Sequence, residues 1–187
     1  MIITGDTYVG RTAARTSSEW HTALGGASLE DRRCHSYLAC VLGNDSVLHF
    51  ELLEADGHPG AAYDVIEVRQ CLDLSAVSRE AKVRICLRSR PFGNSQGGVG
   101  VLGFYPFGEY RFTIIRYGAL RLRSGVNVAD LLALDCAQLF DARGVSIASS
   151  SLMLLNVRGH GTSGSIQLVS RSLGERLLRF YPSIYSS

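Results

Sequence analysis

Lysine is almost absent from this chain. Lys82 is the only lysine, and all other residues that carry a positive charge at pH 7 are arginines. The formal charge is only +2 at pH 7. A balance so close to neutral gives no strong electrostatic field, so we expect neither nucleic acid nor an anionic membrane as a clear partner. Arginine suits bidentate contacts with carboxylates and phosphates, although a bias toward GC-rich codons explains the same preference.

Long apolar runs are also missing. No stretch approaches the roughly 20 residues of a transmembrane helix, and the first residues lack the basic-then-apolar order of a secretion signal. The five cysteines (Cys34, Cys40, Cys71, Cys86 and Cys136) form an odd set without close pairs. Their apolar neighbours predict small buried side chains. We therefore predict no membrane span and an intracellular, cytoplasmic protein in a reducing compartment.

Residues that could carry catalysis show no paired spacing. Adjacent residues of a strand point to opposite faces, so Cys34 and His35 are not expected to act as nucleophile and base. A hydrolase or transferase would have to assemble its site from distant strands, for example with His49 or His160 beside an acid and a nucleophile. We predict that the protein is not an enzyme and that it has no cofactor.

Two short motifs suggest ligands. Carboxylates at Glu54, Asp56 and Asp64 border a turn rich in glycine and proline, where they could hold calcium, but no clustered ligand set supports a metal site, so none is predicted. The segment 159–164 has the G-x-G-x-x-G spacing of dinucleotide-binding loops, which a helix must follow. Here the segment 165–169 has the pattern of a strand, and we predict a hairpin turn instead.

Alternating apolar and polar residues predict a β-rich fold. The predicted strands and alternating segments are 37–42, 46–54, 63–71, 81–88, 110–114, 120–123, 151–157 and 165–171. Turn residues at 43–45 should join the first two as a β-hairpin, and the alternation over 81–88 is typical of a half-solvated antiparallel strand. Helical spacing predicts one helix capped by Asn127 and reaching Leu139, and a short helix over 174–181.

These elements predict a mainly β fold: a single antiparallel β-sandwich with one or two short helices. The residues 1–187 form one β-rich domain, in which 1–33 make a partly irregular segment packed on the rest. We also expect a bulge or turn at Gly118, where the alternation changes phase, and a mobile loop over 89–98.

One part of the sequence resembles a known family. The segment 47–57 followed by 63–66 is similar to the strand–loop–strand unit of C2 domains, and 154–157 with 164–168 is similar to the way in which these domains end. The resemblance implies a C2-like β-sandwich. Acidic residues in a second loop are missing, so it implies a calcium-independent variant used for protein contacts. A jelly-roll-like sandwich is the alternative.

The candidate contact surface consists of four arginines and three aromatic residues: Arg111, Arg116, Arg121, Arg123, Phe104, Tyr105 and Phe107. Arg84 and Arg88 could extend it on a neighbouring strand. Two simpler interpretations stay open, since outward strand positions need soluble side chains and the aromatic residues could pack in the core. We predict a non-catalytic protein-interaction, scaffold or assembly module whose partner is a protein, and another copy of the chain is one candidate. The alternative is a self-assembling viral structural protein with a jelly-roll fold.

Overall fold

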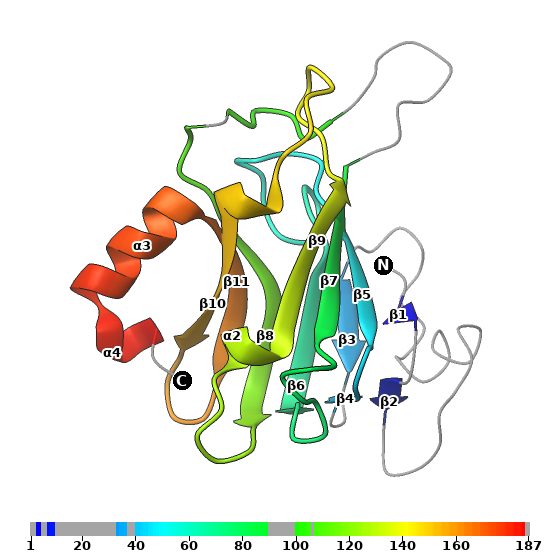
Figure 1. The fold of residues 1–187 in the computed structure, drawn as a ribbon, viewed down its shortest axis with the longest axis vertical. Coiled ribbons are helices and arrows are strands. Elements are labelled where there is room, and N and C mark those ends of the chain that lie inside the picture. Colours follow the sequence, from blue (N-terminus) through cyan, green and yellow to red (C-terminus); the bar gives the residue numbers. More distant parts are fainter. Residues whose placement is uncertain are drawn as a thin grey trace.

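The computed structural model describes residues 3–4, 7–9, 33–36, 40–89, 100–105 and 107–185. Two sheets dominate this part of the chain, and short helices lie at their ends and on one side (Figure 1). The prediction of a mainly β fold is confirmed. The expectations for the amino-terminal segment and for the loop around residues 90–99 concern parts outside the described residues.

The smaller sheet has four strands in the order β1-β5-β7-β9. Their bounds are Ile3–Thr4 (β1), Val47–Glu51 (β5), Val83–Arg88 (β7) and Leu132–Gln138 (β9). Strand β1 is antiparallel to β5, whereas β5 and β7 are parallel, as are β7 and β9. We call this sheet A.

The larger sheet, sheet B, has the order β10-β11-β8-β6-β4-β2, and β3 also pairs with β6. Its strands are Thr7–Val9 (β2), Arg33–Ser36 (β3), Cys40–Leu42 (β4), Val65–Asp73 (β6), Arg111–Arg121 (β8), Leu152–Arg158 (β10) and Gly164–Ser170 (β11). Strand β6 is parallel to β3, β4 and β8, while β8, β11 and β10 are successively antiparallel.

The prediction of a purely antiparallel fold is therefore wrong, since both sheets contain parallel pairs. Strand β7 illustrates the reason. Val83, Ile85 and Leu87 are buried and the residues between them are not, as predicted, but β7 lies parallel to both neighbours. Alternation reports that one face of a strand is solvated, and it carries no information on the direction of the neighbouring strands.

The predicted hairpin over residues 37–54 is also wrong. The residues before β5 do form a turn, in which Asp45 has a φ of 58°. However, this turn carries the chain from β4 in sheet B to β5 in sheet A, and these two strands do not pair with each other. Turn residues fix the local direction of the backbone, but they do not fix the sheet that each strand joins. Leu42 and Leu48 are both buried (each 1% exposed), one in sheet B and the other in sheet A.

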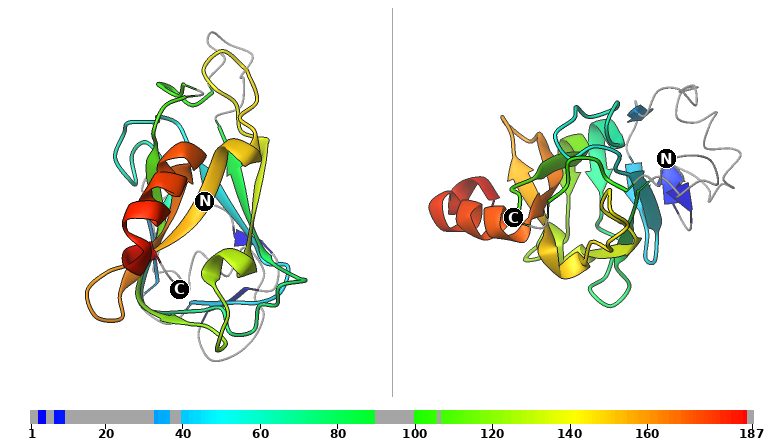
Figure 2. Two further views of the ribbon diagram at one scale, coloured as in Figure 1. Left: turned by 60° about the vertical axis from the view of Figure 1, so that its left-hand side comes forward. Right: turned by 90° about the horizontal axis from the view of Figure 1, so that it is seen from above.

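Side chains from the two sheets meet in one apolar cluster. Phe50 and Ile85 come from sheet A, and Phe112, Ile114 and Leu168 come from sheet B; all are 0–1% exposed. Each such side chain contributes about 1.5–3 kcal/mol relative to an exposed one. Viewed from above, the strands surround this core and the carboxy-terminal helices lie outside it (Figure 2).

Strands outnumber helices in the part of the chain that the structure describes. Helix α2 (Val128–Leu131) is a single turn without a side-chain cap from Asn127, so the predicted helix to Leu139 is wrong beyond its first turn. Its remainder forms β9, because pairing with β7 satisfies the backbone there. A short 3₁₀ helix, η1, spans Ser149–Ser151.

The carboxy-terminal helix is confirmed, with an earlier start than predicted. Helix α3 spans Arg171–Phe180, and α4 spans Pro182–Tyr185. Gly174 lets α3 approach the outer face of sheet B closely, since a Cβ atom there would lie 2.1 Å from Sδ of Met153. No helix in the described ranges has the length and apolarity needed to cross a membrane.

The irregularity expected at Gly118 lies in the strand beside it. Between Val68 and Cys71, β6 has one residue more than β8 has opposite it. The carbonyl oxygen of Arg69 consequently approaches Gly118, where a Cβ atom would lie only 2.2 Å from it. Glycine at 118 thus makes room for a bulge in β6.

Candidate functional site

Three loops meet at one end of the two sheets, at the top of Figure 1, and their described residues are 52–63, 100–105 with 107–110, and 139–148. Backbone hydrogen bonds hold them together. The amide of Leu102 donates to Leu53 over 2.7 Å, and the amide of Ala55 donates to Leu102 over 2.8 Å. On the other side, the amide of Val101 donates to the carbonyl of Phe140 over 2.8 Å. The middle loop is therefore fixed to both neighbours.

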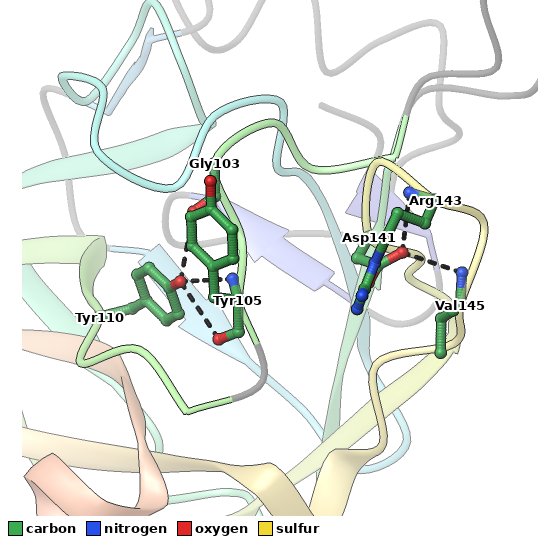
Figure 3. A network of polar contacts seen from close by, with 6 residues as sticks. All are labelled: Gly103, Tyr105, Tyr110, Asp141, Arg143 and Val145. Carbon is green, nitrogen blue, oxygen red and sulfur yellow. Dashed lines mark hydrogen bonds and ion pairs between the residues drawn. The ribbon is translucent and has the colours of Figure 1, made fainter.

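The Tyr110 side chain organises the loop 100–110 from within (Figure 3). Its hydroxyl oxygen accepts a hydrogen bond of 2.5 Å from the amide of Tyr105, and it lies 3.2 Å from the carbonyl oxygens of both Gly103 and Tyr105, to which its proton can be donated. The Tyr110 ring stacks on Phe104 with centroids 4.6 Å apart. Gly108 is required here, because a Cβ atom would lie 2.2 Å from the Tyr110 hydroxyl.

Asp141 organises the neighbouring loop in a similar way (Figure 3). Its Oδ1 accepts from the amides of Arg143 and Val145, each at 2.9 Å, and its Oδ2 accepts from the Arg143 guanidinium at 2.7 and 3.1 Å. Burial alone would raise the pKa of this carboxyl, but the hydrogen bonds from Arg143 and Val145 outweigh it and the pKa is lowered. Gly100 packs against the Asp141 backbone, with its hypothetical Cβ 1.8 Å from the carbonyl oxygen.

These two fixed loops expose large apolar side chains. Phe107 is 97% exposed and Tyr105 is 70% exposed, with Val145 at 54% and Leu102 at 45%. We call these four residues the loop cluster. The structure thus separates the predicted aromatic residues: Phe104 is buried, as the core-packing interpretation expected, whereas Tyr105 and Phe107 are presented to solvent.

Two carboxylates border the loop cluster. Glu54 forms a β-bridge with Leu102, and Oδ1 of Asp56 lies 3.3 Å from the position of a Cβ on Gly103. Both side chains are exposed. Neither Glu54 nor Asp56 forms an ion pair with any residue that the structure describes.

The four predicted arginines do not join this surface as free cations. Arg116 pairs with Glu67 at 2.9 Å and Arg121 pairs with Asp73 at 3.2 Å. In both pairs the partners are in register on the parallel strands β8 and β6. Arg123 lies beyond β8 and donates to the carbonyl of Ser75 at 2.6 Å.

Arg111 starts β8 and is exposed. Arg84 and Arg88 lie on β7 in sheet A, so they are not on a strand next to β8, and Arg88 pairs with Glu51 at 2.9 Å. The arginine pattern is therefore explained in large part by cross-strand neutralisation of carboxylates.

The segment 159–164 forms the turn of the β10–β11 hairpin, which confirms the prediction of a hairpin turn. It borders a shallow hollow of about 370 Å³ beside the middle of β8, lined by Thr113, Arg116, Tyr117, Val157, Arg158, Gly159, Ser163, Gly164 and Ser165. The Tyr117 hydroxyl donates to Asn156 at 2.5 Å. Gly164 allows this ring to approach the backbone, since its Cβ would lie 2.4 Å from the hydroxyl.

A row of potentially reactive side chains crosses sheet A. His49, Cys86 and Asp135 are in register on β5, β7 and β9. The Cys86 thiol lies 3.8 Å from Oδ2 of Asp135. Burial and the adjacent carboxylate raise the pKa of Cys86, and burial with Arg88 lowers the pKa of His49. The Cys86 thiol therefore stays protonated between the Asp135 carboxylate and the neutral His49 imidazole. A cysteine that acts as a nucleophile needs the opposite, a lowered thiol pKa.

The three carboxylates considered for calcium do not converge. Asp64 is buried and accepts from the amide of Glu51 at 2.8 Å, while Glu54 and Asp56 are exposed. Within the described ranges, no group of three or more His, Cys, Asp or Glu side chains is arranged to hold a metal ion. The His160 side chain lies on the β10–β11 turn, in the other sheet from His49.

The sequence pattern singles out Tyr105 and Phe107, which the structure exposes, but not the residues that position their loop. The Asp141–Ala–Arg–Gly144 sequence was an available signal, because an aspartate that begins a glycine-containing turn often binds the following amides. Nothing local marked Leu102 or Val145. No family model, no curated protein and no solved structure matches the chain, so the C2 resemblance stays a hypothesis.

Proposed function

We propose that this protein is a non-catalytic interaction module that binds a protein partner through the loop cluster. The observation that carries the proposal is the almost complete exposure of Phe107 (97%) beside Tyr105 (70%). Contiguous exposed aromatic side chains are typical of protein contact sites, where they contribute large apolar area. Tyrosine adds a hydroxyl that can bond to a partner at the rim.

Preorganisation supports the same function. The Tyr110 hydroxyl bonds, the stacking on Phe104 and the strand-like bonds of Leu102 fix the loop backbone before any partner binds. A fixed loop loses little conformational entropy on association, so more of the contact energy appears as affinity. The two sheets act in this proposal as a sandwich-like support for the three loops.

The arginines on β8 are less suited to bind a partner. Arg116 and Arg121 would have to give up Glu67 and Asp73 before they could bind an external carboxylate or phosphate. A viral structural protein would use the loop cluster in the same manner, with the partner being another subunit.

The test is site-specific photocrosslinking in the source cells with benzoylphenylalanine in place of Phe107. The matched control carries the same group at His160, an exposed position on the β10–β11 turn. We expect a protein adduct from position 107 only, and we expect Tyr105→Ser to abolish it. Adducts that are identical from both positions, or that survive Tyr105→Ser, would overturn the proposal. Since the side chains of Tyr105 and Phe107 are exposed, substitution of either one should not alter the free energy of unfolding by more than about 0.5 kcal/mol.

A further inference from the structure

The large exposed apolar side chains of the described residues fall into two groups. Four form the loop cluster, and the other four lie on the carboxy-terminal helices: Leu178 (38% exposed), Phe180 (66%), Tyr181 (54%) and Ile184 (42%). We call the second group the helix cluster. It spans only seven residues of sequence, at the end of α3 and in α4.

The two clusters lie at opposite ends of α3. The Ser170 amide, at the amino end of α3, donates to the Tyr110 carbonyl at 3.0 Å, and Arg176, in the middle of the helix, pairs with Glu109 at 2.6 Å. These contacts place the aromatic loop beside the start of the helix. The helix cluster lies at the carboxyl end, where α4 turns back toward β10 (Figures 1 and 2). The residues of both clusters are exposed, so the two clusters of one copy do not cover each other.

The charges beside the clusters have opposite signs. Glu54 and Asp56 border the loop cluster. Arg179 is exposed between Leu178 and Phe180 and, among the described residues, has no acidic partner. An apolar patch with an acidic border therefore matches an apolar patch with a basic residue within it, which is the complementarity found across specific interfaces.

We propose that the loop cluster of one copy of this chain binds the helix cluster of a second copy. This inference rests on the proposed function and names the partner as the chain itself. Association would remove the exposed surfaces of Phe107 and Phe180 from water together, and it would bring Asp56 or Glu54 near Arg179 of the other copy. Since each copy carries one cluster of each kind, such contacts repeat from copy to copy and form either a closed ring or an open filament.

The decisive experiment mixes two variants in analytical ultracentrifugation. The loop variant is Tyr105→Ser with Phe107→Ser, and the helix variant is Phe180→Ser with Tyr181→Ser. We expect the wild type to associate with increasing concentration and each variant alone to stay monomeric. An equimolar mixture should form a one-to-one complex, because the loop variant keeps an intact helix cluster and the helix variant keeps an intact loop cluster. The His160→Ser variant is the control and should associate like the wild type.

Exchanging the charges of Asp56 and Arg179 tests the same contact independently. Asp56→Arg and Arg179→Asp should each weaken association, about two- to five-fold for an exposed pair, and a mixture of these two variants should recover part of the loss.

Several results would overturn the inference. A helix variant that still associates alone would indicate contact between two loop clusters, and a monomeric mixture would exclude the proposed pairing. If the wild type is monomeric while position 107 captures a different protein in cells, the inference fails and the proposed function stands. If association persists in both variants and position 107 captures nothing, both fail.

Discussion

Replacing Asp141 with asparagine tests how the loops beside the candidate site are held. The carboxylate is 2% exposed and accepts two amide hydrogen bonds at Oδ1 and two guanidinium hydrogen bonds at Oδ2. Asparagine keeps one oxygen for the amides of Arg143 and Val145 but turns an NH₂ group toward the guanidinium. The change therefore removes the charge and the Arg143 contacts while it preserves size and shape.

The expected cost follows from the two parts of this network. The Arg143 side chain is 66% exposed, so water screens its pairing with Asp141 and the pair contributes at most about 1 kcal/mol. The amide bonds become neutral instead of charge-assisted, which costs about 1 kcal/mol more. Asp141→Asn should thus destabilise the protein by about 1–2 kcal/mol, which lowers Tm by roughly 3–6 °C for a chain of this size.

Two further variants separate the contributions. Arg143→Ala removes only the screened pair and should cost at most about 1 kcal/mol. Asp141→Ala leaves the amides without their acceptor and should cost about 2–4 kcal/mol. Urea denaturation at neutral pH provides all three values. If Arg143→Ala proves more damaging than Asp141→Asn, the exposed ion pair rather than the amide network holds the loop, and the reasoning is refuted.

Acid should erase the difference between the wild type and Asp141→Asn. The pKa of Asp141 in the folded protein lies below its ordinary value of 3.8. The folded state therefore binds fewer protons than the unfolded state in this range, and the stability that this carboxylate contributes is fully present above the ordinary value. It is lost as the pH falls through the lowered pKa. A stability difference that stays constant from neutral pH to below about pH 3 would contradict this assignment.

Three other outcomes can be checked on the same protein. Gly118→Ala should destabilise the protein by about 1–3 kcal/mol, because the new Cβ meets a backbone oxygen at 2.2 Å. Gly161→Ala, in open space at a φ of 66°, should cost only about 1 kcal/mol. Equal costs of the two variants in urea denaturation would contradict the bulge beside Gly118. Burial raises the pKa of the Cys136 thiol to about 12, so mass spectrometry after brief iodoacetamide treatment should find it alkylated far more slowly in the folded than in the unfolded protein. Arg116→Ala and Arg121→Ala should each change the free energy of unfolding by at most about 1 kcal/mol and leave association in ultracentrifugation unchanged, and a loss of association would restore the arginines as a contact surface.

The positions of most strands could be predicted from the sequence, because one face of each strand is buried and the other is solvated. Strands β7 and β11 lie within one or two residues of the predicted ranges. Patterns of this kind depend only on burial and require no knowledge of neighbouring strands.

Strand partners could not be predicted. Two ion pairs link β6 and β8, Glu67 with Arg116 and Asp73 with Arg121. They form because the two strands are parallel neighbours, although about 49 residues separate each pair along the chain. Without the pairing, the arginines on β8 resemble an unsatisfied cationic face. The same lack of pairing information made β4 and β5 look like a hairpin, since adjacency in sequence was the only evidence for their contact.

Exposure at the candidate site was the least predictable property. Phe104, Tyr105 and Phe107 form one aromatic segment in the sequence, yet the first is buried and the last is almost fully exposed. The Tyr110 side chain accounts for part of the difference, because it stacks on Phe104 and binds the backbone at Tyr105. The exposed rings of Tyr105 and Phe107 lie in water at a cost in hydration free energy, and burial against a partner would remove that cost. This cost is the physical basis of the contact that we propose at this end of the molecule.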